Sequence, residues 1–584
     1  MNPSRTTRRR LGVATIAMIA IFAVFVIRLV DIQVVRAEEL NSESLDKRAI
    51  AVKTYAARGD VVDKDGVVLA GSVIRYDITV SPMTILSAFR SGDDSEAELL
   101  ASLAAPAAEI AAITGQTQSE VLATFTTEPD SNFEFVAQKV STEQMRAVRE
   151  LDIPGIYFEQ RPSRIYPDGS VAGNLVGFVG TDGPQNGLEI TEDSCLASTD
   201  GFSTYERGAD GVRLPGSTVT TQAPVQGGTV LTTIDHDLQW TVQQMIAEQA
   251  ISIGAESAHA SVVEVKTGKL LALADYPSVD PNNVGGSAPT NMGSLAFSTP
   301  YEPGSTFKPM TAAMLLDQGA ADPTSRVNVP YLWTSPEGSR VRDAVPHGDL
   351  RLTLAGVIQQ SSNVGISQLA VRLPSSTRYN YMRAFGIGER TEVGFQGESA
   401  GLLSDSWNAQ SKYDISYGQG VAVTAAQLAS VYQTIGNGGV RLPLTLVTGC
   451  KQPDGTITDP APTEGRRVVS ESAAKSVVQM MEGVVTGGDL AKQLQIPGFR
   501  VAAKSGTAEL AENGVYTNKR IVSLAGLAPA EDPQYSVIVT FVKPSTIRTS
   551  AAAAPTFQKI MTQVLKTYRV TPSTTPPPGL PTTW

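Results

Sequence analysis

The chain has 584 residues, of which 42% are hydrophobic and 18% are charged, and its formal net charge is −11. A chain of this length is too long for one hydrophobic core, so we expect two or three domains, one of them large. The acidic balance argues against nucleic acid as the main partner.

The two cysteines and three histidines are scattered along the chain, at Cys195, Cys450, His236, His259 and His347. No pair of them has the spacing of metal ligands, so we expect no metal site and no cofactor. A bridge between Cys195 and Cys450 can form in an oxidising compartment, but the sequence gives no reason to favour it.

An apolar run follows the four arginines of residues 1–10. Residues 11–27 are uncharged and mostly apolar, which is just long enough to span a bilayer as a helix. No small-residue cleavage site follows, so we favour an uncleaved anchor over residues 11–30 to a cleaved signal peptide. Because the arginines precede the anchor, the positive-inside tendency predicts a cytoplasmic tail at residues 1–10 and an extracytoplasmic remainder. The sequence therefore predicts a single-pass protein of the cell membrane.

The segment 50–225 predicts one extended module that mixes helices and strands. Apolar runs in 57–82 alternate around Gly66, which indicates a hairpin. An alanine-rich stretch follows and predicts helices, and the glycines and short β-type runs of 164–190 predict strands. The turn-rich stretch that ends at Gly228 predicts a domain boundary.

Residues 229–570 predict a second and larger domain. Its antiparallel strands and terminal helices surround a helix-rich middle, which indicates an α/β domain with helices packed on a sheet. The clearest patterns are a helix over 238–246, a hairpin of 261–265 with 270–274, a strand over 535–542 and an amphipathic helix over 557–568. The proline- and threonine-rich residues 571–584 predict a disordered tail.

The stretch YEPGSTFKPM, residues 301–310, places Ser305 three residues before Lys308 at the start of a predicted helix. The letters PGST recur at 215–218, where Thr220 takes the place of the lysine and no helical pattern follows. A serine at a helix start is most simply an N-cap. However, the helix dipole opposes a lysine in the first turn. The dipole and burial would lower the pKa of Lys308 and let it accept a proton from Ser305.

Ser-x-x-Lys alone is a weak signal, because it also occurs at Ser44 with Lys47 and at Ser472 with Lys475. More weight comes from a later Ser-x-Asn and Lys-Ser/Thr-Gly in that order, the constellation of penicillin-binding proteins and class A β-lactamases.

Each of these two later motifs occurs twice. Ser-x-Asn lies at 361–363, between two helical patterns, and at 406–408, in a polar loop-like segment. Lys-Ser/Thr-Gly lies at 266–268, in the predicted hairpin turn and before Ser305, and at 504–506, after β-type residues. Only the set that begins at 305, 361 and 504 has both the order and the context. Helix capping remains the alternative role for residues 361–363.

With these motifs in place, the chain resembles the class B penicillin-binding proteins, which are membrane-anchored peptidoglycan D,D-transpeptidases, and most closely their FtsI-type division branch. The resemblance is carried by ARGDVVDKDGVVLA, RIYPDGSVAGNLVGFVG, TTIDHDLQ, YEPGSTFK, SSN, YGQGVAVTAAQLA and KSGTA. It implies an α/β penicillin-binding transpeptidase domain at 229–570, with an antiparallel sheet and helices packed on it. An extended α+β pedestal would precede it at 50–225.

The resemblance also implies a role for each site residue. The expected set is a nucleophile, its base, a proton relay and a substrate-binding strand: Ser305, Lys308, Ser361 with Asn363, and Lys504 with Ser505, Gly506 and Thr507. Ser305 would attack a D-alanyl-D-alanine stem peptide, and backbone N–H groups of Ser305 and Thr507 would stabilise the oxyanion. β-Lactams would trap Ser305. The implied partners are a membrane glycosyltransferase of the FtsW type and other divisome proteins.

Other functions remain open, and the sequence weighs against some of them. A histidine-based serine hydrolase is disfavoured because no G-x-S-x-G is present. A class A β-lactamase would need an E-x-x-L-N loop after Asn363, which the chain lacks. A β-lactam sensor would need a cytoplasmic effector, for which the predicted tail at residues 1–10 leaves no room. A pure scaffold would not need Ser305 and Lys308, and the chain has both. An elongation-type class B transpeptidase shares most of the motifs.

Overall fold

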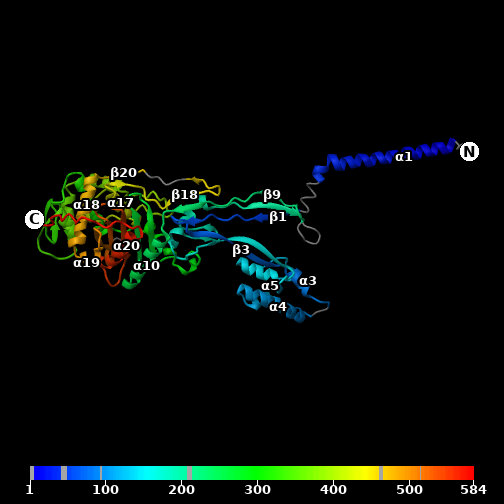
Figure 1. Ribbon diagram of the computed structural model, residues 1–584, viewed down its shortest axis with the longest axis horizontal. Coiled ribbons are helices and arrows are strands. Elements are labelled where there is room, and N and C mark those ends of the chain that lie inside the picture. Colours follow the sequence, from blue (N-terminus) through cyan, green and yellow to red (C-terminus); the bar gives the residue numbers. More distant parts are fainter. Residues whose placement is uncertain (1–4, 41–48, 93–94, 207–213, 459–463, 513–514) are drawn as a thin grey trace.

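The computed structural model describes residues 5–40, 49–92, 95–206, 214–458, 464–512 and 515–584. We call the modules at 50–225 and 229–570 the pedestal and the large domain. Helix α1 lies at one end of the longest axis and the large domain at the other, with the pedestal between them (Figure 1).

Helix α1 (Arg5–Val30) continues into a π-helical turn, Asp31–Val35. The stretch Arg8–Val35 is long and apolar enough to cross a membrane, and none of it is buried against other parts of the structure. The predicted anchor at residues 11–30 lies within α1, which is the candidate for a membrane span.

The helix-rich part of the pedestal is confirmed. Its elements are α3 (Pro82–Phe89), α4 (Glu96–Thr114), α5 (Gln118–Thr126), β4 (Glu134–Val140) and α6 (Thr142–Glu150). Ser95, Thr117 and Ser141 each form a capping box, which fixes where α4, α5 and α6 begin. Helix α4 is also apolar enough to cross a membrane. Its Leu99 and Leu103 are instead buried in the core of this lobe, as expected of a helix in a soluble domain.

The predicted hairpin near the start of the pedestal is also confirmed. Strands β2 (Val61–Val62) and β3 (Val68–Val80) are antiparallel, with Val61 opposite Ala70. Gly66 turns the chain between them with φ of +89°. Strand β5 (Ile156–Ile165) pairs antiparallel with β3 from Gly71 to Val80.

Two expectations for the later part of the pedestal are wrong. The run NGLEI is a helix, α8 (Gly187–Thr191), because the side chain of Asn186 accepts a hydrogen bond from its first N–H and Arg58 and Arg164 bind Glu189. The turn-rich stretch holds two strands that join a third in an antiparallel sheet of order β1-β8-β9: β1 (Ala49–Thr54), β8 (Gly201–Glu206) and β9 (Val219–Gln222). Strand β9 is exposed throughout, β8 is mostly half-buried, and neither has the alternating apolar residues that would indicate a strand.

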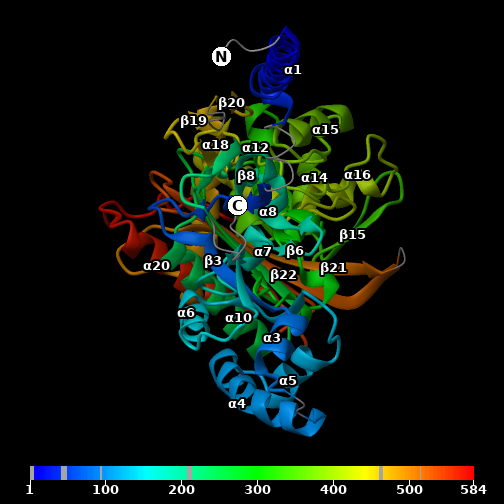
Figure 2. The same cartoon turned by 90° about the vertical axis from the view of Figure 1, so that its right-hand side faces the viewer.

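The large domain is built on a five-stranded antiparallel sheet of order β12-β11-β23-β22-β21. Its strands are β11 (Ser257–Glu264), β12 (Leu270–Tyr276), β21 (Ala502–Glu512), β22 (Val515–Ala528) and β23 (Tyr535–Val542). The hairpin predicted from 261 to 274 and the strand predicted over 535–542 are both confirmed. Figure 2 shows β21 and β22 running out beyond the body of the domain.

Helices cover both faces of this sheet. Gly526 of β22 meets Phe557, whereas the next residue, Leu527, meets Gly436. Successive residues of a strand face opposite ways, so the two helices that carry these partners lie on opposite faces. The helices are α10 (His236–Ile253) and α20 (Ala554–Thr567) on one face, and α17 (Ala425–Gly436), with α12 (Lys308–Asp317) and α18 (Glu471–Gly487), on the other. The predicted helices at 238–246 and 557–568 are thus confirmed as α10 and α20.

The boundary predicted at Gly228 is bridged by strands. Strand β10 (Thr229–Thr232) pairs in parallel with β2 of the pedestal and antiparallel with β18 (Val447–Lys451) of the large domain. Cys195 and Cys450, whose pairing the sequence left open, form a disulfide. They lie 255 residues apart in the chain, so no local pattern could pair them. The bridge closes onto β18 and links the pedestal covalently to the large domain.

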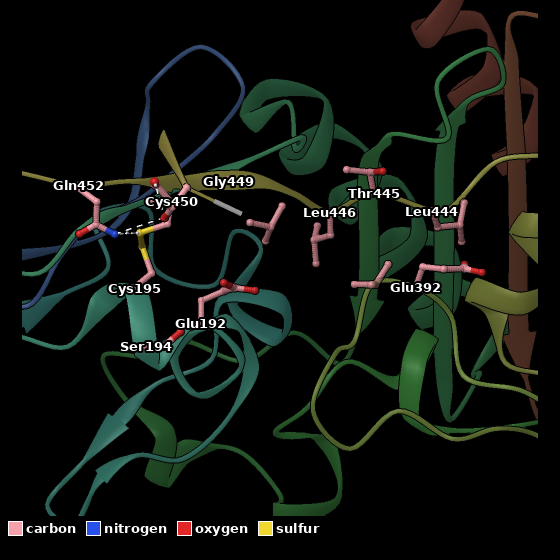
Figure 3. Close-up of a pocket in the computed structure, with 13 residues that line it drawn as sticks. Glu192, Ser194, Cys195, Glu392, Leu444, Thr445, Leu446, Gly449, Cys450 and Gln452 are labelled. Atoms are coloured by element: carbon pink, nitrogen blue, oxygen red, sulfur yellow. Dashed lines mark hydrogen bonds between the residues drawn. A yellow bond between two sulfur atoms is a disulfide. The ribbon is translucent and has the colours of Figure 1, made fainter. Parts of the chain in front are cut away.

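A cavity of about 320 Å³ opens beside this disulfide. Figure 3 shows Cys195, Glu192 and Ser194 on one side and Leu444, Thr445 and Leu446 on the other. Its lining belongs to the junction of the two modules and includes none of the predicted site residues.

The expectation of a disordered tail at 571–584 is also contradicted, because this segment is hydrogen-bonded to the large domain. Ser573 donates its N–H to the Gly498 carbonyl, and Thr582 accepts a hydrogen bond from the Thr353 N–H. The contacts come from residues that are distant in the sequence, which composition alone does not reveal.

Candidate active site

Ser305 lies in a short 3₁₀ turn, Gly304–Phe307, that leads directly into helix α12. Gly304 has φ of +55° and packs against the backbone of Thr507, so a side chain there would be strained and crowded. Its N–H donates to the carbonyl of Gly418 at 3.0 Å. The α-helix therefore begins at Lys308, and the Ser305 hydroxyl lies just before its first turn.

The simplest alternative, that Ser305 is an N-cap, does not fit this geometry. The residues at the cap positions of the turn and of the helix are Pro303 and Phe307, and neither makes a side-chain cap. The hydroxyl oxygen of Ser305 instead lies 2.9 Å from Nζ of Lys308.

Lys308 is fully buried and its amine is surrounded by hydrogen-bonding oxygens. Besides Ser305 Oγ, its Nζ contacts the Ser361 carbonyl at 2.5 Å, Asn363 Oδ1 at 2.7 Å and Ser361 Oγ at 3.3 Å. Burial, followed by the charge of Lys504, lowers the pKa of Lys308 well below its usual value. The expected decrease thus has burial as its main cause. A neutral amine has two N–H donors and one lone pair, which suits the Ser361 carbonyl, Asn363 Oδ1 and the Ser305 hydroxyl proton.

The Ser-Ser-Asn motif lies, as predicted, at the junction of two helices, α13 (Leu354–Gln360) and α14 (Asn363–Ala370). Ser362 is the N-cap of α14, and its hydroxyl accepts the Gly365 N–H at 2.8 Å. Capping therefore belongs to the middle serine. Ser361 has φ of +59°, a left-handed conformation that turns both its carbonyl and its hydroxyl toward Lys308.

The Lys504 motif lies on β21, the edge strand of the sheet. Lys504 is fully buried, and its Nζ donates to Ser361 Oγ at 2.8 Å and to the Ser505 carbonyl at 3.0 Å. Burial lowers the pKa of Lys504 to about 7. A Cβ on Gly506 would lie 2.9 Å from Thr306 Cγ2, so glycine lets the strand approach the Ser305 turn closely. The Thr507 hydroxyl accepts a hydrogen bond from the Ser550 N–H at 3.2 Å.

The duplicate motifs lie elsewhere. Residues 266–268 form the turn between β11 and β12, where Lys266 pairs with Asp532. Residues 406–408 lie in a loop. Ser472 lies on α18, and its hydroxyl donates to Ser470 Oγ. The pair Ser44 and Lys47 lies outside the described residues.

Asp343 is a part of the site that the sequence motifs did not reveal. It is buried, accepts the Val364 N–H at 2.9 Å and contacts His347 Nε2 at 3.0 Å. Its charge opposes the decrease in the pKa of Lys308. Asp343 therefore supports the start of α14 from behind Asn363.

Glu302 is a second such residue, immediately before the Ser305 turn. Its Oε1 accepts the Gly420 N–H at 2.8 Å and the Tyr516 hydroxyl at 3.0 Å. It thereby links the loop beside Gly304 to the projecting β22 strand. The only sequence signal for Glu302 is its place in YEPGSTFK, and for Asp343 there is none.

Comparisons with known proteins agree with this arrangement. Residues 258–562 match the family described as "Penicillin binding protein transpeptidase domain", and residues 53–232 match "Penicillin-binding Protein dimerisation domain". Penicillin-binding protein PbpB of Mycolicibacterium smegmatis is 33% identical to the chain, with 99% of this chain and 92% of that protein covered. Peptidoglycan D,D-transpeptidase FtsI of Escherichia coli is also 33% identical, with 93% of this chain and 89% of that protein covered.

A solved structure extends the likeness to three dimensions. The crystal structure of penicillin-binding protein 3 from Mycobacterium tuberculosis, complexed with aztreonam, matches with a TM-score of 0.69 and 28% identity. The match covers 91% of this chain and 100% of that one.

Proposed function

The chain belongs to the class B penicillin-binding proteins, and we propose that it is a peptidoglycan D,D-transpeptidase that works through an acyl-enzyme on Ser305. The observation that carries the proposal is the 2.9 Å contact between Ser305 Oγ and the fully buried amine of Lys308. A serine becomes a nucleophile when an adjacent base takes its proton, and burial gives Lys308 the lowered pKa that a base needs.

Acylation begins when Ser305 Oγ attacks the carbonyl of the penultimate D-alanine of a stem peptide, while its proton passes to Lys308 Nζ. The C–N bond of the terminal D-alanine then breaks, and its nitrogen needs a proton. Ser361 Oγ lies 3.3 Å from Lys308 Nζ and 2.8 Å from Lys504 Nζ, which suits it to relay that proton. In the second half, the amine of a neighbouring stem attacks the ester, loses a proton and releases Ser305.

Substrate binding falls to the edge strand. The charged form of Lys504, with Ser505 and Thr507, would hold the terminal carboxylate of the donor stem. The backbone N–H groups of Ser305 and Thr507 would stabilise the oxyanion, the term that contributes most to such reactions. Gly506 keeps this strand close to the Ser305 turn. A β-lactam carries a carboxylate and a reactive carbonyl, so it would acylate Ser305 in the same way.

The likeness to FtsI supports a role in septal wall synthesis. Helix α1 would anchor the chain with residues 1–10 in the cytoplasm and the remainder outside. The pedestal at 50–225 would then hold the transpeptidase domain at 229–570 away from the membrane. We further propose that an FtsW-type glycosyltransferase and other divisome proteins bind the anchor and pedestal.

Labelling with a fluorescent penicillin tests the proposal. We expect a lasting adduct on the intact chain that disappears in Ser305→Ala. Ser472→Ala and Ser44→Ala are matched controls, because each removes the serine of another Ser-x-x-Lys, and both should keep the label. Absence of label on folded protein would refute acylation, and rapid loss of label would indicate a β-lactamase. Release of D-alanine from a stem peptide with an acceptor amine then tests transpeptidation itself.

A further inference from the structure

Residues 571–584, which we call the strap, run along the large domain to the helix that carries Ser361. We infer that the strap is a positioning element, which holds helix α13 so that Ser361 and Asn363 reach Lys308. This inference rests on the proposed function, because it concerns the rate at which Ser305 is acylated. Figure 1 shows the C-terminus on the large domain, at the end opposite helix α1.

The first anchor of the strap is Arg500, which in turn binds helix α18. The Ser573 hydroxyl accepts the Arg500 N–H at 2.9 Å, and Arg500 Nη1 donates to Thr575 Oγ1 at 2.9 Å. The other side of the same guanidinium makes two hydrogen bonds, at 2.8 and 2.7 Å, to the buried carboxylate of Glu482 on α18. A two-pronged pair of this kind is strong and directional, so it fixes where the strap begins.

The second anchor is the start of α13. Thr353 donates its N–H to the Thr582 carbonyl at 3.1 Å and its hydroxyl to the Pro581 carbonyl at 2.6 Å. The same hydroxyl accepts the Gly356 N–H at 3.1 Å and so caps the helix. A Cβ on Gly356 would lie only 1.9 Å from the Thr582 carbonyl oxygen, so the strap can approach this helix only because glycine is there. The cap of α13 and the strap are therefore one hydrogen-bonded unit.

Trp584 completes the anchor beyond the helix. Its ring lies over the guanidinium groups of Arg326 and Arg351, at 5.1 and 5.5 Å from the ring centre. These arginines come from the paired strands β13 (Arg326–Val329) and β16 (Leu350–Thr353), and β16 leads directly into α13. Cation–π contacts of this kind stabilise even an exposed site.

The position of α13 matters because its far end is in the catalytic site. The helix has seven residues, and Ser361 follows it in a left-handed conformation that a non-glycine residue keeps only when its surroundings enforce it. Gln359 also donates to the Gly483 carbonyl of α18 at 3.0 Å. The strap joins the same two helices at the opposite end of α13. Without it, the start of α13 would lose both hydrogen bonds of Thr353 to the strap and keep those of the Leu354 and Ala355 N–H groups to the Ser325 and Pro323 carbonyls. We expect this loosening to let Ser361 and Asn363 shift relative to Lys308.

The test uses the full chain in detergent and a variant that lacks residues 571–584. We expect the variant to fold, but the rate constant for acylation of Ser305 by a fluorescent penicillin should fall by about tenfold to a hundredfold, as for a displacement near 1 Å. A synthetic peptide with the sequence of 571–584 should restore the rate, and a scrambled peptide should not. Rescue of the rate separates positioning from a general loss of stability. Acylation of the folded variant at the full rate would overturn the inference.

Point variants keep the inference testable if the shortened chain does not fold. Trp584→Ala should slow acylation several-fold, whereas Trp584→Phe, which keeps an aromatic ring over the two arginines, should not. Trp240→Ala is the matched control, because Trp240 is an exposed tryptophan on α10. An unchanged rate in Trp584→Ala would contradict the inference. If the intact chain itself is not acylated at Ser305, the proposed function fails first and the inference fails with it.

Discussion

Lys308 and Lys504 are both fully buried and share the hydroxyl of Ser361. Each would prefer to be neutral, and the charge of Lys504 further lowers the pKa of Lys308. The site can therefore hold one positive charge, on Lys504, more readily than two. That division suits a base at Lys308 and a carboxylate-binding cation at Lys504.

The pH dependence of acylation follows from this division. As pH falls through the lowered pKa of Lys308, the base becomes protonated and the rate constant should decrease. As pH rises through about 7, Lys504 loses the charge that attracts the β-lactam carboxylate, and the rate constant should decrease again. Stopped-flow acylation of the free protein across this range measures both limbs. The Lys504→Arg variant keeps a positive charge at this position, so the decrease in rate at alkaline pH should disappear while the decrease at acidic pH remains. If the alkaline decrease is unchanged in this variant, a group other than Lys504 causes it.

The buried charge of Lys504 should also destabilise the fold. Its pKa is about 7 in the folded chain and 10.5 when exposed, so the unfolded state binds more protons between these values, and stability should rise with pH across that window. Replacement by methionine removes this penalty and should increase the free energy of unfolding at pH 7 by a few kcal/mol, while acylation is lost. Denaturant unfolding at pH 7 and at about pH 10 checks this prediction, because the extra stability of Lys504→Met over the unmodified chain should be smaller at the higher pH. A less stable Lys504→Met variant at pH 7 would show that the hydrogen bonds of Lys504 outweigh its burial.

The junction of α13 and α14 divides its work between two adjacent serines. Ser362 caps α14 with its hydroxyl, whereas Ser361 gives its hydroxyl to the two lysines. Under the proposed mechanism, one of these adjacent serines would contribute to stability and the other to the chemistry.

Alanine substitutions at these two serines should therefore have opposite effects. Ser362→Ala should cost about 1 kcal/mol of unfolding free energy, the usual value of an N-cap, and leave acylation within a few-fold. Ser361→Ala should slow acylation by on the order of a hundredfold with a smaller change in stability. Denaturant unfolding and penicillin acylation of the two variants, measured side by side, provide the comparison. Equal losses of rate in both would mean that the junction acts only as a rigid turn.

Elements with strong periodicity were predictable, and those defined by distant partners were not. The amphipathic pattern around Phe557 gave α20, and the β-type run at 535–542 gave β23 with its bounds. Strands β8 and β9 were not predicted because neither has alternating apolar residues, and pairing of β8 with β1 and of β9 with β8 defines them. The strap escaped because Thr353 and Arg500, far away in the sequence, hold it.

The site follows the same rule. Motif order and helix context favoured Ser305, Ser361 and Lys504 over their duplicates, and the structure brings these three within hydrogen-bonding distance of Lys308 or of each other. Asp343 carries no motif, because its contribution depends on the fold bringing it behind Asn363. The main cause of the lowered pKa of Lys308 could not be ranked from sequence either, since burial is a property of the folded core.

The pedestal and the large domain are joined by one continuous sheet and by the Cys195–Cys450 disulfide. Strand β10 lies between β2 of the pedestal and β18 of the large domain, and the disulfide ties β18 to the short helix that contains Cys195. The cavity beside the bridge lies at the same junction (Figure 3). The two modules are therefore held in one orientation by backbone pairing and by a covalent bond, and we expect that orientation to depend on oxidation.

Removal of the disulfide should loosen this junction without affecting the chemistry at Ser305. A bridge between residues 255 positions apart restricts the unfolded chain strongly, so Cys195→Ser with Cys450→Ser should lose about 2–4 kcal/mol of stability. Thermal unfolding of the full chain in detergent should show a lower Tm for the double variant. Dithiothreitol should lower the Tm of the unmodified chain by the same amount and leave the variant unchanged. The penicillin acylation rate at room temperature should be equal in the unmodified chain and in the double variant, because neither cysteine contacts the site.

Two results would contradict this prediction. A double variant with an unchanged Tm would mean that the shared sheet alone holds the modules together. A double variant with slow acylation would mean that the junction acts on the site.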